Sequence, residues 1–363
     1  MTNATTAKRE QLKPPISNIG IIGWLKTNLF STWYNSLLSI IMLGMLALMF
    51  PPVFQWAFVD SLWYSSAEAC RNIEGACWSV VPHNFRFIIL GFFPEGQEWR
   101  PILAMILLLG LVIYSKERSR WKKSLAWLWL VNLVVMGTLM YGGVLGMPVV
   151  ETSQWSGLPL TLVLSFFGMV VAYPMGIFLA LGRRSKMPAI KTLCVVYIEM
   201  IRGVPLISLL FMSSIMFPLF LPEGVTIDKV LRALIAIILF TAAYIAEVVR
   251  GGLQAMPRGQ YEAADSLGLN YSQTMRLIIL PQALKIVIPP SVGILLSVFK
   301  DTSLVVIIAL YDVLKTTMVT LSNPEWAGYS KESYIFLALL YFAFCYAMSS
   351  YSRRLEKELH TGH

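Results

Sequence analysis

Charged residues are scarce in this sequence: Lys, Arg, Asp and Glu together make up 13% of the 363 residues, whereas 56% are hydrophobic. A soluble domain carries about 25% charged residues. The composition therefore excludes a soluble globular protein, a disordered protein and, despite a formal net charge of +9, a nucleic-acid-binding protein. The basic excess is better explained by contact with lipid headgroups at the cytoplasmic face of a membrane. We expect an all-α polytopic membrane protein.

Motifs of catalysis and metal binding are also missing. The sequence has no GxxxxGK[ST] nucleotide loop, so any ATP hydrolysis must belong to a separate chain. It has no HExxH or GxSxG motif, and its three histidines, His83, His360 and His363, fall in loop or tail segments. We therefore expect no catalytic residue, no metal ion and no cofactor bound by this chain.

Cysteine is rare as well, and four residues are too few for a disulfide scaffold. Cys194 and Cys345 lie in apolar runs, where a packed thiol is the usual state. Cys70 and Cys77 share one polar loop and could pair if that loop faces an oxidising compartment. The sequence leaves this pairing open.

What the sequence has in abundance is long apolar segments. A helix needs about 20 apolar residues to cross the roughly 30 Å hydrocarbon core of a bilayer. Segment 190–221 is too long for one straight span and contains Pro205 and Pro218, so we expect it to tilt, to break or to begin in the cytoplasm. The eight candidate spans are 37–59, 100–115, 124–147, 158–182, 190–221, 230–250, 284–310 and 333–352.

The distribution of basic residues orients these spans. If the N-terminus is inside, the inner segments and their flanks hold 20 of the 29 Lys and Arg residues, and the outer segments hold seven. Because short cytoplasmic loops carry the excess of Lys and Arg, both termini are expected to be cytoplasmic. Residues 1–36 then form a cytoplasmic tail rather than a signal peptide, and residues 353–363 form a second tail.

The longest inner loop, residues 251–283, is polar and contains two short helical patterns, 258–267 and 271–280. Gly268 between them can adopt the left-handed conformation that ends a helix, and Ser272 could cap the second helix. Such a helix–turn–helix would present four residues to a soluble partner: Glu262, Ala263, Ala264 and Asp265. From composition alone, an amphipathic surface linker fits the same stretch.

The loop resembles the EAA loop of the membrane subunits of binding-protein-dependent ABC importers. The matching residues, in the register of that motif, are Glu262, Ala263, Ala264, Gly268, Ile278, Leu280 and Pro281. Four further stretches resemble polar amino-acid permeases: Tyr197–Leu206, Ala242–Leu253, Gly259–Ala264 and Phe299–Val305. The three additional N-terminal spans and the stretch Trp99–Ala104 resemble the M-like subunit of general L-amino-acid permeases of the Aap type.

This resemblance implies a type I ABC importer permease core of five helices at 148–352, preceded at 37–147 by three helices with a periplasmic loop at 60–99. It also implies that the loop at 251–283 is a coupling helix gripped by an ATPase, with Glu262, Ala263, Ala264, Asp265 and Gly268 as coupling residues. The implied location is the bacterial inner membrane. The implied partners are a second homologous permease subunit, two copies of an ABC ATPase that carry ATP and Mg²⁺, a periplasmic amino-acid-binding protein and an L-amino-acid substrate.

Five ionisable residues fall inside the candidate spans: Glu199, Arg202, Glu247, Lys300 and Asp301. Such residues are costly in hydrocarbon and mark candidate pathways or gates. Glu199 and Arg202, three residues apart on one helical face, could instead satisfy each other. We expect Glu247 to anchor the coupling loop through Arg250 or through a basic partner surface.

The stretch Lys300, Asp301, Thr302 and Ser303 suggests a discontinuous span, because its last three residues are good helix N-caps and Pro289 and Pro290 lie upstream. A half-helix N-terminus beside charged side chains would suit an amino-acid zwitterion. A gate or an inter-subunit ion pair is the alternative.

The rival function is a stand-alone secondary amino-acid transporter that uses Glu247 or Asp301 as an ion-coupling site. Such a carrier has no need of an EAA loop, so this loop discriminates between the two functions.

Overall fold

The computed structural model describes residues 20–359, which are helical apart from the two-residue strand β1 (Tyr311–Asp312) and the connecting loops. The chain divides into two compact units, Met1–Ser79 and Val80–His363. Residues 1–19 of the predicted N-terminal tail and residues 360–363, which include His360 and His363, lie outside the described residues.

The first unit is built around one long apolar helix. Helix α1 (Gly20–Asn28) precedes α2 (Trp33–Phe54), which continues as the π-helical turn η2 (Gln55–Val59), and α3 (Ala67–Cys70) follows. Pro51 and Pro52 lie inside α2 and cannot donate backbone hydrogen bonds, and the π-helical turn begins shortly after them. Since α2 is apolar all round and exposed along the described unit, it suits a lipid environment. The predicted span 37–59 lies within α2 and η2 taken together, Trp33–Val59.

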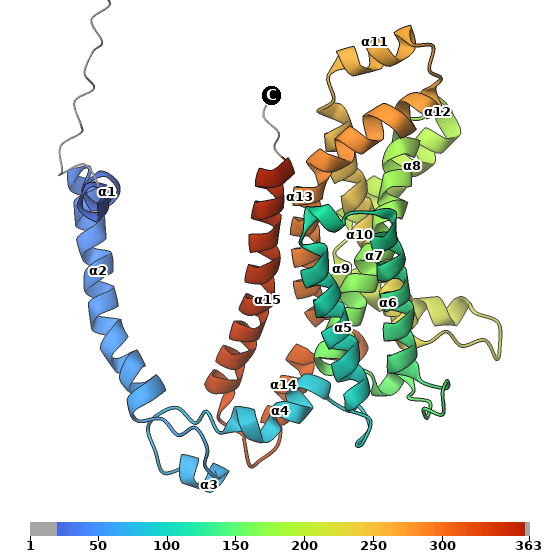
Figure 1. Cartoon of the computed structure of the whole chain (residues 1–363). Helices are drawn as coiled ribbons and strands as arrows, with labels where there is room; N and C mark the ends of the chain where they lie inside the picture. The colour runs from blue at the N-terminus through green and yellow to red at the C-terminus, as the bar shows by residue number, and fades with distance from the viewer. Residues whose placement is uncertain (1–19, 360–363) are drawn as a thin grey trace, which may run out of the picture. The chain divides into compact units, whose positions relative to one another are not determined.

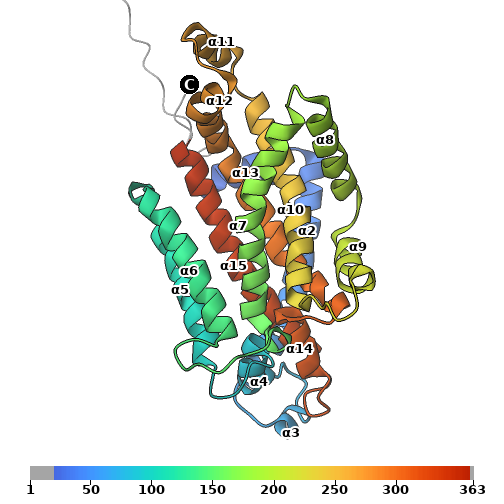
Figure 2. The ribbon, with the colours of Figure 1, turned by 90° about the vertical axis from the view of Figure 1, so that its right-hand side faces the viewer.

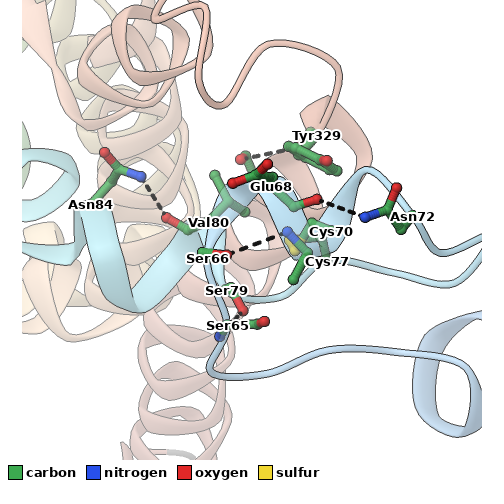
Figure 3. The surroundings of a disulfide bond; sticks show 12 residues. Ser65, Ser66, Glu68, Cys70, Asn72, Cys77, Ser79, Val80, Asn84 and Tyr329 are labelled. Atoms are coloured by element: carbon green, nitrogen blue, oxygen red, sulfur yellow. Dashed lines mark hydrogen bonds between the residues drawn. A yellow bond between two sulfur atoms is a disulfide. The ribbon is translucent and has the colours of Figure 1, made fainter.

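The loop after α2 is closed by a disulfide between Cys70 and Cys77, whose Cα atoms are 5.6 Å apart. Figure 3 shows this bond with its surroundings. Backbone hydrogen bonds hold the same loop, from Leu62 N to Ala76 O at 2.9 Å and from Ala76 N to Trp56 O at 2.8 Å. The pairing that the sequence left open is thus present in a folded loop.

The second unit contains the remaining spans. Its α-helices are α4 (Val80–Leu90), α5 (Trp99–Ser115), α6 (Lys123–Tyr141), α7 (Gly157–Arg183), α8 (Pro188–Gly203), α9 (Leu206–Phe211), α10 (Lys229–Gln254), α11 (Arg258–Ser266), α12 (Tyr271–Gln273), α13 (Leu280–Asp301), α14 (Val313–Leu321) and α15 (Ser330–Leu359). Short 3-10 and π-helical pieces are η3 (Arg118–Arg120), η4 (Thr152–Gln154), η5 (Met212–Met216), η6 (Phe217–Phe220), η7 (Thr274–Ile279) and η8 (Thr302–Ile308).

Helix α7 forms the middle of this unit and lies against α10, α8 and α13 (Figures 1 and 2). Gly176 allows the closest approach to α10, because a Cβ atom there would lie 2.5 Å from Ile245 Cγ2. Helices α5 and α6 form a hairpin, and α5 also contacts α7. Two of the three predicted N-terminal spans therefore belong to the same compact unit as the five-helix core.

The eight predicted spans all coincide with helices. Across the described residues, six helical stretches are long and apolar enough to cross a membrane, and α5 is a shorter apolar helix. The remaining segment, 190–221, is a helix pair, α8 followed by α9 to Phe220, bent by 103°. The predicted break is confirmed, and it lies where Val204 and Pro205 adopt extended backbone conformations.

The predicted discontinuity at 300–303 is wrong. Helix α13 runs through Pro289 and Pro290 to Asp301 and passes directly into η8. The hydroxyls of Thr302 and Ser303 donate to the carbonyls of Phe299 and Lys300, both at 2.8 Å, instead of capping a new helix. Such bonds to the preceding turn are compatible with a continuous chain, so the span exposes no half-helix N-terminus here.

Candidate coupling segment, charged cluster and cavity

The loop between α10 and α13 forms the two arms that the sequence predicts. Helix α11 ends at Ser266, and the amide of Leu269 donates to Ala264 O at 3.2 Å while that of Gly268 donates to Asp265 O at 2.9 Å. Gly268 has φ +72°, so the predicted left-handed turn is confirmed. The predicted cap is wrong: Asn270, not Ser272, caps the second arm, through a reciprocal pair of hydrogen bonds with Gln273 at 2.9 and 3.0 Å.

Helix α11 turns one face outward. Glu262, Ala263 and Asp265 are exposed, whereas Ala264 is fully buried. The expectation that all four residues face a partner is therefore wrong for Ala264. It lies one turn after Tyr261, which packs on an apolar cluster that includes Met256 and Met275. The sequence analysis did not single out Leu267, which is 75% exposed at the end of this helix.

Two contacts attach α11 to the membrane spans. Arg184, directly after α7, donates to the hydroxyl of Tyr261 at 3.2 Å and to Leu253 O at 3.3 Å. Its guanidinium also lies 5.7 Å from the centre of the Tyr261 ring. On the other side, the Gln282 amide in α13 donates to Gln260 Oε1 at 3.2 Å. Side chains as well as the backbone therefore connect α11 to α7 and α13.

A cluster of charged residues joins three helices near this segment. Glu247 of α10 accepts hydrogen bonds from Arg183 of α7 at 2.7 Å and from Arg250 at 2.8 Å, and Arg202 of α8 lies 3.5 Å away. The Glu247 side chain is only 15% exposed. The predicted contact between Glu247 and Arg250 is confirmed, and three guanidinium groups surround this one carboxylate.

The sequence-based pairing of Glu199 with Arg202 is wrong. Glu199 instead pairs with Arg183 at 2.9 Å, while Arg202 turns to Glu247 and lies 5.5 Å from the centre of the Tyr244 ring. The helical spacing of Glu199 and Arg202 permits a contact, but better partners come from α7 and α10. Arg183 was missed as a site residue because its distance along the sequence gives no signal of this contact.

A cavity of about 370 Å³ lies between α10 and α13. Asp301 lines it together with Thr241, Tyr244 and Ser297. The Thr241 hydroxyl is buried and has no hydrogen-bond partner among the described residues. Of the four predicted pathway residues at 300–303, Asp301 alone contributes to this wall: Lys300 is exposed elsewhere, and Thr302 and Ser303 bond to the backbone.

A further buried carboxylate, Asp312, was not anticipated. It is fully buried and caps α14 by accepting a hydrogen bond from Lys315 N at 3.0 Å, and the Tyr341 hydroxyl lies 3.4 Å away. Burial raises the pKa of this carboxyl, although the hydrogen bonds that it accepts act in the opposite direction. Its position at the end of β1, outside the apolar runs, concealed its burial in the sequence.

Comparison with known proteins gives one matching family model, the "Binding-protein-dependent transport system inner membrane component", over residues 172–361. The inner membrane amino-acid ABC transporter permease protein YhdY of Escherichia coli is 49% identical over 344 residues, which cover 93% of each chain. The glutamate/glutamine/aspartate/asparagine transport system permease protein BztC of Rhodobacter capsulatus is 36% identical over the full length of both chains.

Among solved structures, the crystal structure of an amino acid ABC transporter with histidines matches 56% of this chain and 92% of its own chain, with 32% identity and a TM-score of 0.51. The two full-length relatives therefore share the N-terminal spans, whereas the structural match covers little more than half of the chain.

Proposed function

The chain belongs to the family of binding-protein-dependent transport system inner membrane components, and we propose that it is the permease subunit of an ATP-driven importer of L-amino acids, moved by an ATPase that grips α11. Its relatives are amino-acid ABC transporter permeases, which supports a non-catalytic membrane role for this chain. ATP and Mg²⁺ bind to the separate ATPase.

The exposed face of α11 carries this proposal. Glu262, Ala263 and Asp265 combine small size with negative charge on a helix that ends at a fixed turn, and Gly268 sets the direction of that turn. Through Arg184 and Gln282 the helix is tied to two spans. When two ATPase copies close on ATP, they draw the coupling helices together, and the attached spans rotate to open the path outward.

The substrate pathway runs past Asp301. A carboxylate in a cavity of about 370 Å³, beside hydroxyl groups of Thr241 and Tyr244, offers a counter-charge for the substrate ammonium. The pathway is completed by a second homologous permease subunit, which this chain needs because a two-fold path requires two such cores. The cluster of Glu199, Arg202, Glu247 and Arg250 acts in this proposal as a structural link between the pathway helices and the coupling segment.

The orientation follows from the basic residues. Both termini and the loop at 251–283 are cytoplasmic, in the bacterial inner membrane, and the loop with Cys70 and Cys77 faces the periplasm, where a disulfide persists. The periplasmic amino-acid-binding protein delivers substrate from that side.

The direct test is affinity purification of the tagged chain from its native membrane, followed by uptake in vesicles. We expect two ATPase copies and a second permease subunit to copurify with the chain. Glu262→Ala should lower ATPase recovery several-fold, because it removes an exposed carboxylate of the coupling face. Glu356→Ala, at an exposed position near the end of α15, should leave it unchanged.

The same vesicles distinguish the rival function. Uptake that survives removal of the ATPase but stops when an uncoupler dissipates the ion gradient would identify a secondary transporter and contradict the proposal.

A further inference from the structure

A second cavity, of about 600 Å³, opens beside the coupling segment and is separate from the cavity at Asp301. Its walls come from the connection between α7 and α8 and from the second arm of the coupling segment. Its polar and basic lining comprises Arg184, Ser185, Lys186, Tyr271, Ser272 and Arg276.

The charge of this pocket has one sign. Arg184, Lys186 and Arg276 are exposed cations, and the described residues that line the pocket include no Asp or Glu. Within residues 20–359, none of the three cations forms an ion pair. Three unneutralised cations around one hollow attract an anion, and arginine favours the paired oxygens of a phosphate group.

The other walls are apolar. Leu181, Met187, Ile190 and Leu280 line the same pocket, and Met187 is 58% exposed. The candidate span α7 ends at this pocket, and the candidate span Tyr271–Ile308 begins there. The pocket therefore lies at the membrane surface. A soluble phosphate ion would contact only the cations and leave the apolar wall of the pocket without a partner. A phospholipid contacts both walls, with its headgroup on the cations and its glycerol and acyl region on the apolar side chains.

We propose that this pocket binds the headgroup of an anionic phospholipid from the inner leaflet. The assignment to the inner leaflet rests on the proposed cytoplasmic position of the coupling segment. Arg184 uses two hydrogen bonds on Leu253 O and Tyr261, which leaves donors of its guanidinium for a phosphate. The bound headgroup fixes the position of Arg184, and the contact of Arg184 with Tyr261 in turn fixes α11. The lipid composition therefore changes how efficiently transport is coupled to ATP hydrolysis.

The test uses the purified transporter complex in nanodiscs of phosphatidylcholine with and without phosphatidylglycerol. We compare Lys186→Gln/Arg276→Gln with Lys122→Gln/Lys123→Gln, which removes two exposed cations at the start of α6. Native mass spectrometry reports how much phosphatidylglycerol each complex retains. Arg184 is left intact because it also holds Tyr261.

We expect the pocket variant to retain phosphatidylglycerol about 30-fold more weakly than the wild type, given the usual contribution of two interfacial cations. Phosphatidylglycerol should also stimulate ATPase activity in the wild type and in the control variant, but not in the pocket variant. Equal loss of lipid in the two variants would show a general basic surface and overturn the proposal, as would unchanged retention in the pocket variant.

Two further outcomes would also overturn it. Displacement of the lipid by inorganic phosphate would assign the pocket to a soluble anion. If the pocket variant recovered less ATPase but retained as much lipid as the wild type, the pocket would be assigned to an acidic surface of a protein partner. Since lipid retention is measured independently of uptake, a failure of this inference is distinguishable from a failure of the proposed transport function.

Discussion

Glu247 accepts a hydrogen bond of 2.7 Å from Arg183, and this contact links α10 to the end of α7. The same carboxylate also neutralises Arg250 and Arg202. The stability of this end of the bundle therefore depends on one acidic side chain more than on any of the arginines around it.

Glu247→Gln should lower the free energy of unfolding by about 2 kcal/mol. This value is smaller than that for a fully buried ion pair, because the side chains of the arginines are about a quarter to a third exposed. The change leaves three guanidinium groups facing one another with Glu199 as their remaining counter-charge. Thermal unfolding in detergent measures the effect. The control is Glu358→Gln, which breaks the more exposed contact with Arg354 on α15 and should shift the unfolding temperature far less.

Gly268→Ala should weaken coupling without disturbing the spans. An alanine in the left-handed region costs about 1–2 kcal/mol, and a Cβ atom at this position would meet no neighbour within 4 Å, so the effect is one of backbone conformation. We expect ATPase recovery and ATP-driven uptake to fall together. Gly251→Ala, in the interior of α10 and equally free of contacts, should retain both; an equal loss in the two variants would contradict a special role for the turn.

Asp301→Asn should reduce amino-acid uptake about tenfold or more, because it removes a charge-assisted contact with the substrate ammonium. ATPase recovery should be unchanged, since Asp301 lies in the cavity between α10 and α13 rather than on α11. The control is Lys300→Gln, whose side chain is exposed outside that cavity. Normal uptake by Asp301→Asn would remove this residue from the pathway.

Cys70→Ser/Cys77→Ser should destabilise the folded loop by about 2.5 kcal/mol on the chain-entropy estimate for a loop closed over a separation of seven residues. In intact spheroplasts, protease added outside should then cleave between residues 60 and 79 faster than in the wild type. The matched variant Cys194→Ser/Cys345→Ser changes two unpaired thiols and should not alter this cleavage. Protection of the loop in both variants, with cleavage after lysis, would place it inside.

Asp312→Asn should change the pH dependence of stability. Burial raises the pKa of Asp312, so the folded state holds its proton more tightly than the unfolded state. The contribution of this carboxyl to stability is complete below its ordinary pKa and is lost as the pH rises through the raised value. Asparagine keeps the cap on α14 without a titrating group. Relative to the wild type, the variant should therefore gain in unfolding temperature as the pH rises above the ordinary pKa of an aspartate.

The control for this prediction is Asp228→Asn, which alters an exposed N-cap on α10. Thermal unfolding at several pH values measures both variants. If the difference from the wild type changes with pH as much for Asp228→Asn as for Asp312→Asn, burial is not the cause.

The parts of this architecture that depend on local patterns could be predicted. Apolar runs predicted the spans, Pro205 predicted the break after α8, and Gly268 predicted the turn after α11. Each of these properties depends on residues close together in the sequence. The family motif likewise led to the coupling segment, although only the structure separates exposed Glu262 from buried Ala264.

Contacts between distant residues could not be predicted in the same way. Glu199 and Arg202 satisfy a helical spacing, but Arg183 and Glu247 compete for them from other helices. The caps expected at 301–303 failed for a related reason, since hydroxyl groups can bond backward as well as forward and tertiary packing kept the chain helical. The burial of Asp312 depends on α14 and α15 together.

The bend of 103° between α8 and α9 restricts what can surround it. Gly203 and Pro205 are exposed there, and the backbone leaves helical geometry between them. Peptide groups without helical partners are not tolerated against hydrocarbon. The bend must consequently contact water or another polypeptide. It cannot face the acyl chains of the lipid.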